Sequence, residues 1–234
     1  MADLTVVVIY LAASAAYLIL GLGRMSARIH IALRVLLKCL PVFVLLAYLV
    51  VGGGGTLTVS PVRGAITRPL DSNWRLIFIS LLFSIAGDAL LLFKGIKAVF
   101  ISGIAAFSAA QVCNILLLGG LRAEGMWAGV FVAILSTSVY LLSLFPNIKS
   151  YLILPSFVYT VILSVVLWRG LVILQNDKWS NAVVAMGMGA VSYYISDLTL
   201  GIHLFAVRVP LGEYLIMVTY YIAQVLLFLS VYFD

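Results

Sequence analysis

Eight apolar segments, each separated from the next by a polar stretch, constrain the fold of this chain more than any other feature. A helix needs roughly 20 mainly apolar residues to cross the hydrocarbon core of a bilayer, because it rises about 1.5 Å per residue. Only 9% of the residues are charged and 65% are hydrophobic, so the chain lacks the charge that covers a soluble domain. The segments run over residues 4–22, 31–51, 74–93, 97–118, 126–145, 150–172, 181–205 and 211–232.

This pattern predicts an all-α membrane protein, a bundle of eight transmembrane helices in a single integral membrane domain over residues 1–234. Asp3 precedes the first segment where a signal peptide would have basic residues, which favours a membrane span. The one long connection, residues 52–73, is too short for a second domain. Membrane orientation and oligomeric state stay open at this point.

Three short matches recur in the same order in the two halves of the chain, at offsets of 114, 109 and 113 residues. One interpretation is a parallel repeat of two four-helix halves, residues 1–120 and 121–234, related by an axis along the membrane normal. The other is that short apolar matches arise by chance. The matched pairs are Pro41 with Pro155, Asp88 with Asp197, and Gln111 with Gln224.

Several polar side chains fall inside the predicted spans, where a charge is costly unless it faces a partner or a cavity. Counting helix rises from the nearest loops places them in one half of the bundle, on the side where the even-numbered segments begin. Spacing of four residues puts Ser84 on the Asp88 face of its helix and Tyr220 on the Gln224 face. The deep polar residues are Arg34, Lys38, Asp88, Gln111, Asn114, Asp197, Tyr220 and Gln224.

Structural interpretations compete with functional ones at these positions. Lys38 either pairs with an aspartate or extends its amine to the membrane surface. Gln111 and Asn114 are typical of hydrogen bonds that join membrane helices. A purely structural role for both aspartates is the least favoured interpretation, because Lys38 is the one deep lysine available to neutralise them.

Four segments carry a resemblance to a known family. They are Leu37-Lys38-Cys39-Leu40-Pro41, Phe83-Ser84-Ile85-Ala86-Gly87-Asp88, Ile195-Ser196-Asp197-Leu198-Thr199 and Tyr220-Tyr221-Ile222-Ala223-Gln224. Together they resemble the YhhN-like lysoplasmalogenase family of eight-span proteins, and most of all its animal transmembrane branch. Many members of that family have a histidine where this chain has Gln111, so a proton-shuttling role of that histidine would be missing or moved here.

The resemblance implies hydrolysis of the vinyl ether bond of lysoplasmenylethanolamine or lysoplasmenylcholine. The products would be a fatty aldehyde and glycerophosphoethanolamine or glycerophosphocholine. In an animal cell it also implies residence in the endoplasmic reticulum membrane. Neither composition nor spacing by itself indicates this activity or this location.

A vinyl ether hydrolyses by protonation at carbon, followed by addition of water to an oxocarbenium-like cation. Two buried carboxyl groups suit this reaction, because one holds a proton while the other stays ionised. We predict Asp197 as the general acid and Asp88 as the base, with the opposite assignment open because such a pair titrates together. Lys38 would favour the ionised form of the aspartate that it touches.

Other polar residues are expected to support this pair. Arg34 would meet the substrate phosphate, and the rest would orient the carboxyl groups, the water or the glycerol: Ser84, Ser196, Tyr220, Tyr221 and Gln224. No metal, cofactor or nucleic acid is expected. The competing prediction is a proton-coupled carrier or lipid transporter, since repeats and intramembrane aspartates are typical of such proteins.

Overall fold

A computed structural model describes residues 4–22, 31–51, 72–121, 124–176 and 179–232. Within these residues the chain is helical and contains no strand. The elements are α1 (Leu4–Ala16), η1 (Tyr17–Gly21), α2 (Ile31–Val51), α3 (Ser72–Leu91), α4 (Lys97–Leu117), α5 (Met126–Val139), η3 (Tyr140–Leu144), η4 (Phe145–Asn147), α6 (Ser150–Asn176), α7 (Asn181–Gly201), η5 (Ile202–Ala206) and α8 (Gly212–Ser230).

The all-α prediction is confirmed, and the helices follow the eight apolar segments closely. Seven of the described helices are long and apolar enough to cross a bilayer, and Leu4–Leu20 is a shorter apolar helix. The predicted connection 52–73 lies mostly outside the described residues, and α3 already begins at Ser72.

The sixth segment was predicted to end near residue 172, and α6 continues a few residues further, to Asn176. Arg169 is a charged residue inside this otherwise apolar helix, and its contacts make the charge compatible with an apolar environment. Its guanidinium is buried and donates from Nε and Nη2 to the Leu118 carbonyl oxygen, at 3.3 and 3.2 Å. A cation there satisfies a carbonyl group just beyond the end of α4.

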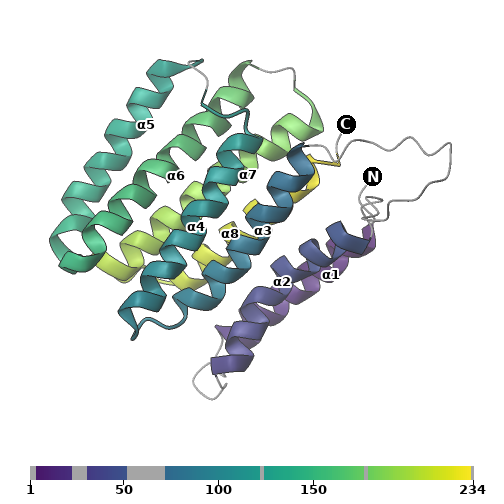
Figure 1. The fold of residues 1–234 in the computed structure, drawn as a ribbon, viewed down its shortest axis with the longest axis horizontal. Coiled ribbons are helices and arrows are strands. Elements are labelled where there is room, and N and C mark those ends of the chain that lie inside the picture. The colour runs from purple at the N-terminus through teal and green to yellow at the C-terminus, as the bar shows by residue number, and fades with distance from the viewer. Residues whose placement is uncertain (1–3, 23–30, 52–71, 122–123, 177–178, 233–234) are drawn as a thin grey trace.

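The helices run side by side along one common direction (Figure 1). The pair α1 and α2 forms one edge of the bundle and α5 forms the other, while α3, α4, α7 and α8 lie between them. Even-numbered helices begin at the lower end in Figure 1, which we call the lower end of the bundle. Charged residues near the ends of α3 and α7 therefore come close to those near the starts of α2 and α8.

The surface of the bundle is largely apolar, and many of its polar side chains are buried between the helices. Trp127, Phe131 and Leu142 are 87, 68 and 80% exposed, whereas Asp88 and Gln111 are at most 1% exposed. A large apolar surface of this kind fits a lipid environment better than water. The described chain is therefore a multi-pass membrane protein.

Gly87 allows α3 and α4 to pack closely beside Asp88. A Cβ atom at Gly87 would lie 2.5 Å from the Phe107 ring of α4, which is far inside van der Waals contact. Helix pairs in membranes commonly use small residues for such approaches. The Phe107 ring thus lies against α3 one residue away from the buried carboxyl group.

Candidate active site

An open cavity of about 530 Å³ enters the lower end of the bundle between α2, α3, α4, α7 and α8. Its walls are mostly apolar, and two acidic side chains, Asp88 from α3 and Asp197 from α7, lie deep in it. Lys38 and Tyr220 line the same space. The cavity therefore brings together five of the polar residues that the sequence had placed in this half of the membrane: Arg34, Lys38, Asp88, Asp197 and Tyr220.

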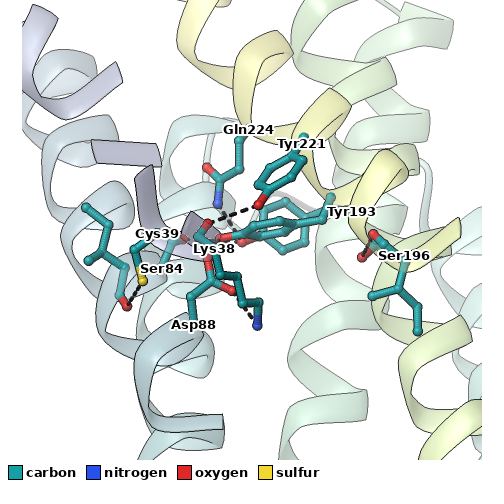
Figure 2. A network of polar contacts seen from close by, with 11 residues as sticks. Lys38, Cys39, Ser84, Asp88, Tyr193, Ser196, Tyr221 and Gln224 are labelled. Carbon is teal, nitrogen blue, oxygen red and sulfur yellow. Dashed lines mark hydrogen bonds and ion pairs between the residues drawn. The ribbon is translucent and has the colours of Figure 1, made fainter. Parts of the chain in front are cut away.

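The Asp88 carboxylate is held by two side chains from different helices. The Nζ atom of Lys38 lies 2.9 Å from Oδ1, and the Tyr220 hydroxyl donates to Oδ2 at 2.7 Å. Figure 2 shows Lys38 extending from α2 to this carboxylate. Lys38 therefore pairs with an aspartate and does not extend its amine to the membrane surface. The ion pair neutralises the Asp88 carboxylate, whose charge would otherwise be costly at this depth.

A proline helps to place Lys38. Pro41 has no N–H group, so it interrupts the hydrogen-bond ladder of α2 one turn earlier. The Tyr221 hydroxyl donates to the Lys38 carbonyl oxygen in that turn, at 3.0 Å. Tyr221 is in turn fixed by Tyr10 of α1, whose hydroxyl donates to the Tyr221 carbonyl oxygen at 2.6 Å. Three helices thus fix the backbone from which the lysine reaches Asp88.

Asp197 has a different set of neighbours. The hydroxyl of Tyr159, on α6, donates to Asp197 Oδ2. The Gln111 side chain of α4 also lies within electrostatic reach of Asp197 and Tyr159. Gln111 Nε2 is buried without a hydrogen-bond partner. Asp197 thus has a tyrosine as its hydrogen-bond donor, whereas Asp88 has a lysine and a tyrosine.

Gln111 is held in place by a chain of hydrogen bonds behind the cavity. Asn114 Nδ2 donates to Gln111 Oε1 at 3.0 Å, and Ser80 of α3 donates to Asn114 Oδ1 at 2.9 Å. The predicted interhelical hydrogen bonding is therefore present for Asn114, whereas the bond between Asn114 and Gln111 lies within α4. Because Asn114 binds Gln111 Oε1, the amide nitrogen Nε2 of Gln111 is left on the side of Asp197.

A second layer of polar side chains supports the wall between the two aspartates. Gln224 donates to the Tyr193 hydroxyl at 3.0 Å, and that hydroxyl lies 3.3 Å from Ser84 Oγ. Figure 2 shows these groups next to the Lys38 and Asp88 pair, with Ser196 apart from them. Ser84 and Gln224 therefore lie behind the cavity wall rather than in it.

Ser196 lines the cavity, but its hydroxyl donates to the Ile216 carbonyl oxygen of α8 at 3.0 Å. Adjacent helical residues point to different faces, so its place next to Asp197 in the sequence does not bring the two groups together. Arg34 also lines the cavity, closer to the lower end.

Three residues near the site were not predicted from the sequence: Tyr159, Lys94 and Glu213. Tyr159 is an aromatic residue in an apolar helix, without a motif around it. Lys94 lies between α3 and α4, and Glu213 lies in the first turn of α8; both line the cavity near its mouth. Charges at helix ends are common in membrane proteins, so only the fold distinguishes these two.

A second, narrower cavity of about 90 Å³ adjoins the first between α4, η3, α6 and α7. Asp197 lines both cavities, as do apolar residues that include Phe107 and Leu200. Polar groups in the second cavity are largely paired with each other, as in the 2.8 Å contact between the Ser136 and Tyr194 hydroxyls. Asp197 therefore lies where an open, charged space meets a narrow, apolar one.

Three π-helical turns, η1, η3 and η5, continue α1, α5 and α7 at the lower end. Each of them contributes residues to a cavity wall: Tyr17 of η1 to the open cavity, Tyr140 of η3 to the narrow one, and Leu204 of η5 to both. Such turns are rare and are often found near functional sites.

The arrangement provides two carboxyl groups with unequal surroundings in a largely apolar space. In sites with paired carboxyl groups, such a difference in surroundings makes one group the acid and the other the base. Within the described residues, no group of three His, Cys, Asp or Glu side chains is placed to hold a metal ion. Two carboxyl groups with unequal surroundings can transfer protons.

Comparisons with known proteins show the family of this chain. Residues 33–231 match the model of the YhhN family. The chain is 34% identical to lysoplasmalogenase TMEM86A of Bos taurus over 197 residues, covering 83% of this chain and 76% of that protein. It is 32% identical to lysoplasmalogenase TMEM86A of Homo sapiens, with the same coverage. It is also 32% identical to lysoplasmalogenase TMEM86B of Homo sapiens over 196 residues, covering 83% of this chain and 74% of that protein. No solved structure gave a significant match. With a family model that covers most of its length and relatives above 30% identity, this chain belongs to the YhhN family.

Proposed function

We propose that this protein is a lysoplasmalogenase, an ether hydrolase that cleaves the vinyl ether bond of lysoplasmalogens. The products are a fatty aldehyde and glycerophosphoethanolamine or glycerophosphocholine. Relatives that carry the name lysoplasmalogenase, at 32–34% identity, support the activity. The observation that carries the proposal in this chain is the pair Asp88 and Asp197, on one cavity but with different partners.

Asp197 is the general acid in this proposal. Its hydrogen-bond partner Tyr159 is neutral, and the ion pair of Lys38 is with Asp88. A carboxyl group in an apolar site without its own cation keeps its proton more readily than one with a cation. Asp197 donates this proton to the β carbon of the vinyl ether, and the neighbouring carbon becomes an oxocarbenium ion.

Asp88 is the base. Lys38 and Tyr220 hold it ionised, so its negative charge stabilises the cation and accepts a proton from the attacking water. The water oxygen adds to the cationic carbon and forms a hemiacetal. The hemiacetal proton then passes to the glycerol oxygen as the carbon–oxygen bond breaks, which yields aldehyde and alcohol. A proton moves from Asp88 to Asp197 and restores the starting state.

The remaining predicted residues act as supports. Gln111, held by Asn114, is placed to orient Asp197 or the water through its amide nitrogen Nε2. Ser84, Ser196, Tyr221 and Gln224 fix the helices that carry the pair, through the hydrogen bonds described above. Arg34 lines the open cavity and contacts the substrate phosphate there.

The narrow cavity beyond Asp197 takes the part of the fatty chain next to the vinyl ether. Its walls are mainly apolar, and it begins where the acid lies. The headgroup then extends in the opposite direction, into the open cavity. This pose places the bond to be cleaved between the two aspartates.

We also propose that all eight helices cross the membrane, in two parallel four-helix halves. The contacts of the aspartates support a repeat. Lys38 of α2 and Tyr220 of α8 contact Asp88, and Tyr159 of α6 and Gln111 of α4 are the neighbours of Asp197. Each aspartate is thus reached from the second helix of its own half and the fourth helix of the other half. By analogy with the family's animal branch, the membrane is that of the endoplasmic reticulum.

Purified protein in detergent tests this function. With a lysoplasmalogen as substrate it should release a fatty aldehyde, and in deuterated water that aldehyde should carry deuterium on the carbon next to the carbonyl group. A lysophospholipid with a saturated alkyl ether should give no product, because it has no double bond to protonate. A protein that is folded but forms no aldehyde would refute the proposal and favour the carrier.

Replacing Tyr159 by phenylalanine should lower kcat about tenfold, because one hydrogen bond to the acid is lost. KM should change little, since the hydroxyl contacts Asp197 and not the headgroup. The matched control is Tyr232→Phe, because the Tyr232 hydroxyl has no hydrogen-bond partner within the described residues. Equal kcat values for the two variants would show that Tyr159 does not position the acid.

A further inference from the structure

The mouth of the open cavity carries charges of both signs. Lys94 lies in the connection between α3 and α4, Glu213 lies in the first turn of α8, and Arg34 lies near the start of α2. All three line the same space as Asp88 and Asp197. The mouth is therefore a place where opposite charges of a ligand would each find a partner.

Lys94 and Glu213 are near each other without being paired. Removal from water lowers the pKa of the Lys94 amine, while the Glu213 carboxylate acts on it in the opposite direction. Among the described residues, neither side chain forms a hydrogen bond or an ion pair within 4.0 Å. Their charges interact across a gap, and the gap opens into the cavity.

Tyr17 lies at the cavity wall near both Glu213 and Arg34. Its ring lines the cavity at the end of α1 and lies within electrostatic reach of both Glu213 and Arg34. Two cations and one carboxylate thus surround the opening. A zwitterion with one phosphate and one ammonium group matches this arrangement, whereas a neutral ligand would leave the charges unused.

We propose, on the basis of the proposed function, that the mouth is a subsite for a phosphoethanolamine headgroup. Lys94 and Arg34 bind the phosphate, and Glu213 accepts hydrogen bonds from the primary ammonium group. A primary ammonium has three N–H donors, whereas the trimethylammonium of choline has none. Choline offers the Glu213 carboxylate no hydrogen-bond donor, so the subsite selects ethanolamine.

This assignment agrees with the direction of the substrate in the cavity. The charged mouth lies at the lower end of the bundle, the aspartates lie further in, and the narrow apolar cavity adjoins the open one at Asp197. The headgroup of a lysophospholipid stays near the membrane surface and its chain extends inward. The glycerol then spans the distance between the mouth and the aspartates.

The test measures initial rates of aldehyde release by purified protein in detergent. Three lysoplasmalogens with the same alkenyl chain are compared, with ethanolamine phosphate, choline phosphate or a phosphate monoester as headgroup. The variants are Glu213→Gln and Lys94→Gln. Their matched controls are Glu124→Gln, an exposed acid at the other end of the bundle, and Lys97→Gln, whose amine lies over the Tyr151 ring.

The wild type should prefer ethanolamine to choline by about tenfold in kcat/KM, the effect of one charged hydrogen bond. Glu213→Gln should remove this preference through KM, with kcat unchanged. Lys94→Gln should raise KM for all three substrates about fivefold, the effect of one half-exposed phosphate contact. The two controls should behave like the wild type.

Two results would overturn the subsite while leaving the enzyme in place. One is a wild type that cleaves the choline substrate as well as the ethanolamine substrate. The other is a Glu213→Gln variant with the preference of the wild type. If no substrate gives aldehyde with the wild type, the proposed function fails, and the subsite with it.

Discussion

A Lys38→Met variant should unfold at a temperature about 10 °C lower than the wild type, because removing one partner of a buried ion pair costs about 3–5 kcal/mol. Asp88 is 1% exposed, so its carboxylate would be left in an apolar site with only the Tyr220 hydroxyl. Methionine has nearly the length of the lysine side chain and fills the same space. The loss of stability in this variant is therefore caused by the missing charge and not by a change in packing.

The same variant should also lose aldehyde release. Without the lysine, Asp88 would take up a proton and could no longer act as a base or stabilise the cation. Thermal unfolding in detergent and the aldehyde assay on one preparation measure both effects.

The double variant Lys38→Met/Asp88→Asn distinguishes this explanation from a simple packing defect. An asparagine still accepts the Tyr220 hydrogen bond and carries no charge, so most of the lost stability should return while activity stays absent. Lys149→Met, at an exposed lysine before α6, is the control and should unfold like the wild type. A Lys38→Met protein as stable as the wild type would contradict a structural ion pair.

The fold was largely predictable from the sequence, because lipid allows few choices. Every backbone polar group in the membrane must be hydrogen-bonded within the segment, so an apolar run of about 20 residues is a helix. The ends of the segments were predicted less closely, since α6 ends at Asn176 and not at residue 172. Arg169 lies inside the predicted segment, where the Leu118 carbonyl oxygen accepts its hydrogen bonds.

The site residues that could be predicted from the sequence are those whose burial in a membrane costs much free energy. Asp88, Asp197 and Lys38 stand out in the sequence because charges inside a membrane need a partner. Tyr159 gives no such signal, since a tyrosine is common in apolar helices and its partner lies 38 residues away on another helix. Its role follows only from the packing of α6 against α7.

Closeness in the sequence was the least reliable indication of which residues lie together in the site. Ser196 is adjacent to Asp197, yet a helix turns about 100° per residue and its hydroxyl bonds to α8 instead. Lys94 and Glu213 are far apart in the sequence, but the turn after α3 and the start of α8 meet at the lower end of the bundle. Only the fold places them at one cavity mouth.

Asp197→Asn should lower aldehyde release by about 1,000-fold, within the range of general acid catalysis. The amide has the size of the carboxyl group and still accepts the Tyr159 hydrogen bond, but it has no proton to give to carbon. Asp88→Asn should cause a similar loss for the opposite reason, since an amide neither takes the proton of the water nor stabilises the cation. Glu124→Gln, an exposed acid at the other end of the bundle, should be as active as the wild type.

The central claim is that the acidic side chains of α3 and α7 act together on one substrate in one cavity. Aldehyde release from a lysoplasmalogen by purified Asp88→Asn and Asp197→Asn proteins tests it most directly, with gel filtration to show that each variant is folded. We predict background rates for both variants beside an active wild type. Turnover at the wild-type rate by either folded variant would contradict the account.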